Sequence, residues 1–93
     1  ISLQTISAIE SELSLYPNPT RDILIIDYQT FEERKTAVEV YNTLGQVVLS
    51  QPIEVFEGMN SIKLDLGQLP DGMYLLTIKE PVGYLTKQVV ISR

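Results

Sequence analysis

The chain contains no cysteine, no histidine and no tryptophan among its 93 residues. Without cysteine it can form neither disulfides nor thiolate sites, so a domain of this size must be held together by packing alone. Without histidine it also lacks the commonest general base and metal ligand of proteins. The composition therefore argues against enzymes that depend on these groups, and we expect no cofactor.

Basic residues and long apolar runs are also scarce. Seven Lys and Arg oppose twelve Asp and Glu, a net charge of -5, and the basic residues are scattered singly. This distribution offers no basic patch to nucleic acid. No stretch approaches the roughly 18 apolar residues of a membrane helix, so we expect no transmembrane span and no signal peptide in this stretch. The first residue is Ile1 rather than methionine, which suggests a piece of a longer protein.

Short β-rich runs separated by turn residues make up most of the chain. Strands are expected at residues 13–16, 22–28, 36–41, 46–51, 61–66, 73–79 and 84–92. Residues 61–66 alternate apolar and polar side chains, as in a half-exposed antiparallel strand. Residues 22–28 are apolar through the middle, as in a strand covered on both faces or twisting between layers. No amphipathic helix separates these runs, so the sequence predicts an all-β antiparallel sandwich of about seven strands.

Glycines mark the turns between several of these strands. Gly45 supplies the positive φ that closes the turn between residues 36–41 and 46–51. Gly72 ends a turn that has Pro70 at its second position, and Gly83 belongs to the last turn. Tyr74 shares one face of its strand with other apolar residues. We therefore expect the glycines to serve turns and Tyr74 to pack in or cap the sandwich.

Acidic residues offer the remaining route to catalysis or metal binding. Two carboxylates can hydrolyse a glycosidic bond, and Asp65, Asp71 and Glu80 lie near successive turns. Alternation and strand ends nevertheless send the acids to solvent, and no calcium-loop motif is present. The charged residues 32–35 are expected to form a solvated loop. We therefore predict a protein that is not an enzyme and holds no metal.

The stretch LYPNPTRDILI, residues 15–25, stiffens the chain where the first long strand begins. Pro17 and Pro19 hold their own φ angles near -65°, to within about 15°. Each also keeps the residue before it in an extended conformation. The Asn18 side-chain oxygen can cap such a turn. We interpret this stretch as a rigid corner that sets the entry angle of the following strand.

Four motifs in order carry a resemblance to a known family. They are LYPNP at 15–19, VEVYNTLGQVV at 38–48, LPDGMYLLTI at 69–78 and TKQVVI at 86–91. Together they resemble the type A C-terminal sorting domain of the type IX secretion system (Por secretion system) of Bacteroidetes. The resemblance covers residues 13–93, and Gln88 departs from it by standing where an apolar residue is frequent.

The resemblance implies an immunoglobulin-like β-sandwich that acts as an address label for an exported cargo. Residues 13–93 would be the sorting domain, and residues 1–12 the linker to an upstream cargo domain. Its partners would be type IX translocon components and a sortase-like cysteine protease that removes the label by cutting in the linker. The cargo would pass through the periplasm to the outer-membrane surface or the medium. The residues of the expected cleavage region are Ser7, Ala8, Ile9 and Ser11.

The last strand is the candidate contact with the export machinery. If it lies at a sheet edge, its unpaired backbone groups could accept a strand, while Lys87 discourages unwanted pairing. The candidate recognition residues, which include those that match the family, are Pro17, Asn18, Pro19, Gly45, Gly72, Tyr74, Lys87, Val89, Val90 and Ile91.

Two other classes of function stay open at this stage. An immunoglobulin-like adhesion or carbohydrate-binding module would present flat aromatic residues on one face, and Tyr41, Tyr84, Phe31 and Phe56 fall in different strands or loops. A small carboxylate hydrolase would need two acids that converge in a cleft.

Overall fold

The computed structural model describes residues 12–93, which form seven β-strands. The strands are β1 (Glu12–Tyr16), β2 (Ile23–Thr30), β3 (Arg34–Tyr41), β4 (Val47–Val55), β5 (Gly58–Asp65), β6 (Gly72–Lys79) and β7 (Tyr84–Ile91). Within this part of the chain no helix has the length and apolar character needed to cross a membrane. The predicted all-β fold is confirmed.

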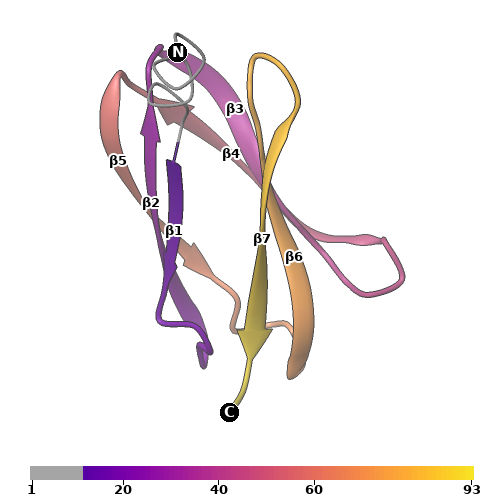
Figure 1. The fold of residues 1–93 in the computed structure, drawn as a ribbon. Coiled ribbons are helices and arrows are strands. Elements are labelled where there is room, and N and C mark those ends of the chain that lie inside the picture. Colours follow the sequence, from indigo (N-terminus) through magenta and orange to yellow (C-terminus); the bar gives the residue numbers. More distant parts are fainter. Residues whose placement is uncertain (1–11) are drawn as a thin grey trace, which may run out of the picture.

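The strands form two facing sheets (Figure 1). One sheet has the order β1-β2-β5 and the other the order β4-β3-β6-β7, and all neighbours are antiparallel. The chain passes from one sheet to the other after β2, after β4 and after β5. Such crossings between two antiparallel sheets are typical of immunoglobulin-like sandwiches. They place β1 and β7 at neighbouring edges of the two sheets.

The core lies between the sheets and takes alternate side chains from each strand. The buried apolar residues are Leu13, Leu24, Ile26, Tyr28, Val38, Val40, Val55, Leu64, Leu66, Tyr74, Leu76, Ile78, Val89 and Ile91. Burying one such side chain stabilises the fold by about 1.5–3 kcal/mol. Because the core includes residues close to the C-terminal end, the last strand is part of the folded body.

The second strand is fully buried on one face only, so its apolar run is not that of a strand covered on both faces. Leu24 and Ile26 are buried in the core, while Ile23 and Ile25 alternate with them and are half-exposed. β2 lies between β1 and β5, so side chains of both neighbours partly cover its outer face. An apolar run in a central strand therefore does not require a second covering layer.

The fourth strand is longer than the sequence predicts. The prediction ends the strand before a proline, whereas the structure continues it through that residue. β4 continues through Pro52 to Val55, whereas the prediction ends it at residue 51. β4 is an edge strand, where proline is tolerated because its missing N–H would face solvent. The turn into β5 is closed by the Asn60 side chain, which accepts a hydrogen bond from the Phe56 N–H (2.9 Å). The sequence has no strong turn dipeptide here from which this turn could be predicted.

Candidate recognition surface

Residues 17–20, here called the proline corner, belong to the connection between β1 and β2 and lie against β7 (Figure 1). Both the Tyr16–Pro17 and the Asn18–Pro19 peptide bonds are cis. The Asn18 Nδ2 donates to the Gln88 carbonyl oxygen (2.9 Å), and the Asn18 Oδ1 accepts from the Val90 N–H (3.0 Å). The Asn18 oxygen thus bonds a distant strand, whereas the sequence suggested a cap within its own turn.

Thr20 continues the same contact by pairing with β7 as a one-residue parallel bridge. The Thr20 N–H donates to the Val90 carbonyl oxygen and the Ser92 N–H donates to the Thr20 carbonyl oxygen, both at 2.9 Å. The Thr20 side chain is 2% exposed, and its hydroxyl donates to the Ile23 carbonyl oxygen (2.6 Å). The proline corner therefore joins the last strand to the first hairpin. Nothing in the sequence pattern singled out Thr20.

The C-terminal residue Arg93 holds the other side of β7. Its backbone N–H donates to the Asp71 carboxylate (3.0 Å), and its guanidinium donates to the Leu69 carbonyl oxygen (2.7 Å) and the Leu66 carbonyl oxygen (3.2 Å). The N–H of Arg93 and its ion pair lower the pKa of Asp71 below its ordinary value. The end of the chain is thus tied to the proline corner on one side and to the β5–β6 loop on the other.

β7 lies at the edge of its sheet, as the last-strand hypothesis requires. Val89 and Ile91 are buried in the core, so a partner cannot read their side chains from outside. Val90 is half-buried on the outer face. Lys87 has the inward orientation of Val89 but is exposed, because it lies near the open margin of the sandwich. An inward-pointing charge is one device by which edge strands avoid unwanted pairing.

Gly45, Gly72 and Tyr74, which are also candidate residues, have clear structural roles in the fold. Gly45 has φ of 81° and its N–H donates to the Asn42 carbonyl oxygen (3.0 Å), so it closes the β3–β4 turn as expected. Gly72 has φ of 153° and opens β6 directly after its turn. Tyr74 is 6% exposed, and its hydroxyl donates to the Pro70 carbonyl oxygen (2.6 Å). Tyr74 thus both packs in the core and caps the preceding turn.

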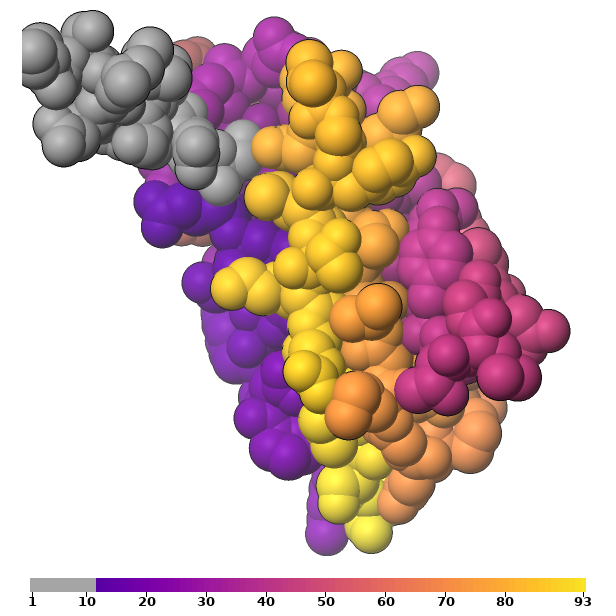
Figure 2. All heavy atoms as spheres, turned by 45° about the vertical axis from the view of Figure 1, so that its right-hand side comes forward, coloured from indigo at the N-terminus to yellow at the C-terminus, as the bar shows by residue number. Residues whose placement is uncertain are grey.

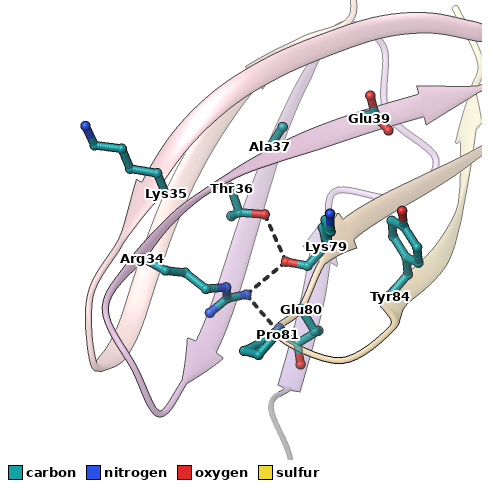
Figure 3. A pocket seen from close by; sticks show the side chains of 9 residues that line it. All are labelled: Arg34, Lys35, Thr36, Ala37, Glu39, Lys79, Glu80, Pro81 and Tyr84. Carbon is teal, nitrogen blue, oxygen red and sulfur yellow. Dashed lines mark hydrogen bonds and ion pairs between the residues drawn. The ribbon is translucent and has the colours of Figure 1, made fainter.

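A hollow of about 560 Å³ lies between the start of β3 and the end of β6 (Figure 3). The Arg34 guanidinium reaches across it to the Glu80 carboxylate (3.0 Å) and the Lys79 carbonyl oxygen (3.0 Å). The same guanidinium donates to the Thr30 hydroxyl (3.0 Å) and lies over the Tyr28 ring, 5.6 Å from its centroid. The N–H donors of the Arg34 guanidinium are thus used within the protein. We therefore interpret the ion pair that spans this hollow as structural.

This network corrects the prediction that residues 32–35 form a solvated loop. Arg34 and Lys35 belong to β3, and the Arg34 side chain is only 15% exposed. Glu80, which the sequence analysis considered as a calcium ligand, is its partner. Residues 12–93 contain no group of three or more acidic side chains placed to hold a metal ion.

The aromatic side chains do not form one continuous face in residues 12–93. Phe31 lies in the β2–β3 loop and Phe56 in the β4–β5 turn. Tyr41 and Tyr84 share the outer face of the larger sheet, where Tyr41 lies opposite Leu75 and Tyr84 opposite Lys79 on the β6 strand between them. The Tyr41 hydroxyl donates to Glu39, and this bond raises the pKa of Tyr41. The arrangement does not favour a flat sugar-binding platform.

A second hollow, of about 410 Å³, has a mostly apolar lining and lies on that outer face. It lies under the β3–β4 hairpin and is lined by Tyr41, Met73, Leu75 and Gln88 among others. Figure 2 shows this side of the molecule, with β7 beside β6 and the hairpin beyond β6. No acidic residue lines the hollow, so it offers no pair of carboxylates for hydrolysis.

Comparison with known proteins places these features in a family. The profile of a family described as "Secretion system C-terminal sorting domain" matches residues 14–92. A search of curated proteins finds no match. The matched stretch includes the proline corner, all of β2 to β7 and most of β1. The expected cleavage residues Ser7, Ala8, Ile9 and Ser11 lie outside both the matched stretch and the described residues.

Proposed function

Because the chain belongs to the family of secretion system C-terminal sorting domains, we propose that its sandwich is recognised as a folded unit by the type IX translocon. Membership makes it a sorting signal for a cargo protein that the type IX system delivers to the cell surface or the medium. The finer proposal is that translocon components contact the proline corner and β7 while the cargo is in the periplasm. A sortase-like cysteine protease then cuts in residues 7–11.

One observation carries the proposal: motifs at opposite ends of the domain form a single surface. The LYPNP and TKQVVI motifs are separated by more than half of the chain, yet Asn18 binds the backbone of Gln88 and Val90 directly. A surface built from both ends exists only when the intervening strands have folded. It can therefore report that the label is complete, independently of the cargo that precedes it.

A reporter fusion tests the proposal directly. Residues 1–93 are placed behind a leader peptide and a fluorescent protein in a bacterium that has the type IX machinery. We expect the reporter at the surface or in the medium, and its retention in the periplasm when the translocon is absent. Periplasmic retention in both strains, with the domain folded, would contradict the proposal.

Mass spectrometry of the exported reporter tests the cleavage step. We expect a new C-terminus within residues 7–11, and an uncut fusion in a strain without the protease. A matched control replaces residues 2–5 by glycine and serine, which leaves the expected cleavage region unchanged. An exported reporter that keeps the sandwich attached in the complete strain would show that this label is not removed.

A further inference from the structure

The outer edge of β7 is divided into a covered part and an open part. Along an edge strand, the backbone groups of every second residue point away from the neighbouring strand. In β7 the Val90 N–H and carbonyl oxygen point away from β6, because both bond the proline corner. By the same alternation the Thr86 N–H and carbonyl oxygen and the Gln88 N–H also point outward. No residue in the range 12–93 pairs with these three groups. The open part is therefore residues 84–88.

A hollow lies directly beside the open part, at the margin between the two sheets. It has a volume of about 290 Å³ and is lined by Glu12, Leu13, Leu85, Thr86 and Lys87. Leu13 is buried and Leu85 half-buried, so part of the lining is apolar, while Thr86 and the oppositely charged Glu12 and Lys87 are exposed and make the rest polar. The hollow thus offers room for an apolar side chain next to unpaired backbone groups.

The opposite edge of the same sheet is protected in a different way. β4 carries Pro52 at a position opposite Ala37, and proline has no N–H to offer an incoming strand. The downstream part of the β7 edge is closed by Asn18 and Thr20. Each edge of this sheet thus has a protected part, and residues 84–88 form an unprotected part of the β7 edge.

We propose that residues 84–88 of β7 accept an extended segment of a partner protein as an added strand. The proposal rests on the proposed function, since it names where the export machinery contacts this label. The added strand pairs its backbone with Thr86 and Gln88 and places one aliphatic side chain in the hollow between Leu13 and Leu85. Polar side chains of the segment lie between Glu12 and Lys87.

Proline substitution tests the backbone pairing without breaking the fold. Thr86→Pro removes an outward N–H, while the N–H groups that bond β6 belong to the neighbouring residues. Glu54→Pro is the matched control, because Glu54 is exposed in edge strand β4 and has the orientation of Pro52. We expect surface delivery of the reporter to fall about tenfold for Thr86→Pro, the effect of losing one or two hydrogen bonds. Glu54→Pro should be delivered like the parent.

A second pair of variants tests the hollow in case proline perturbs the strand. Lys87→Trp fills the hollow with a bulky ring from an exposed position. Lys63→Trp makes the same change on exposed strand β5. We expect reduced delivery only for Lys87→Trp, with both purified variants unfolding at the parent temperature. Parental delivery of both Thr86→Pro and Lys87→Trp would overturn the inference.

Amide exchange of the purified 93-residue chain tests whether the edge is free. We expect the amides of Thr86 and Gln88 to exchange rapidly and those of Leu85 and Lys87 slowly, because only the latter pair with β6. Slow exchange at Thr86 would mean that the chain itself or a second copy occupies the edge, and would refute the inference. If the parent reporter is not exported at all, the proposed function fails, whereas equal export of the parent and Thr86→Pro tells against only the β7 contact.

Discussion

Replacing Asn18 by alanine removes the side-chain contacts between the proline corner and β7. Two hydrogen bonds are lost, at 2.9 Å to the Gln88 carbonyl oxygen and at 3.0 Å from the Val90 N–H. Each intramolecular hydrogen bond contributes about 0.5–1.5 kcal/mol, and water can replace part of it at this exposed site, so we expect a loss of about 1–2 kcal/mol. For a domain of this size that lowers Tm by roughly 4–15 °C.

The chemistry of the amide gives a sharper version of this prediction. The Val90 N–H can only donate and the Gln88 carbonyl can only accept, so Asn18 must supply one acceptor and one donor. Asn18→Asp keeps the acceptor, loses the donor and sets a charged oxygen against the Gln88 carbonyl. It should therefore recover little of the stability that Asn18→Ala loses.

Urea unfolding measured by circular dichroism and amide exchange at Val90 check these expectations. The control is Asn42→Ala, because the Asn42 side chain also makes two hydrogen bonds to the backbone, both accepted by its oxygen and both within one hairpin. Asn42→Ala should destabilise the fold without selectively accelerating exchange at Val90. If Asn18→Ala unfolds at the parent urea concentration and Val90 exchanges at the parent rate, the corner does not hold the last strand.

Three further substitutions test other parts of the fold. Tyr74→Phe loses the hydroxyl bond to the Pro70 carbonyl oxygen and should cost about 1 kcal/mol in urea unfolding. Arg34→Met removes one partner of a largely buried ion pair and should cost about 2–4 kcal/mol by the same measurement; a neutral result would mean that packing alone holds that end of the sandwich. The lowered pKa of Asp71 means that its contact with Arg93 stabilises the fold fully above the ordinary value of 3.8 and loses this effect as pH falls through the lower folded pKa. The Tm difference between the parent and Asp71→Asn should therefore be largest near neutral pH and shrink in strong acid, whereas a constant difference would contradict the assignment.

Local sequence patterns determined the elements of this protein. Alternation at 61–66 and the asparagine and glycine of the β3–β4 turn act over a few residues, so they predict strands and turns without knowledge of the rest. The same holds for Tyr74, because its hydroxyl donates to the Pro70 carbonyl oxygen only four residues earlier. Family resemblance carried the prediction from a sandwich to a sorting label, and the profile match confirms that family.

The tertiary structure decided which groups meet across the sandwich. The Asn18 side chain binds residues 70 and 72 positions away, and Arg34 pairs with Glu80 across 46 positions. Such partners depend on the order and register of strands in two sheets, which a local pattern does not encode. For the same reason only the fold shows that the proline corner covers one part of the β7 edge and leaves residues 84–88 open.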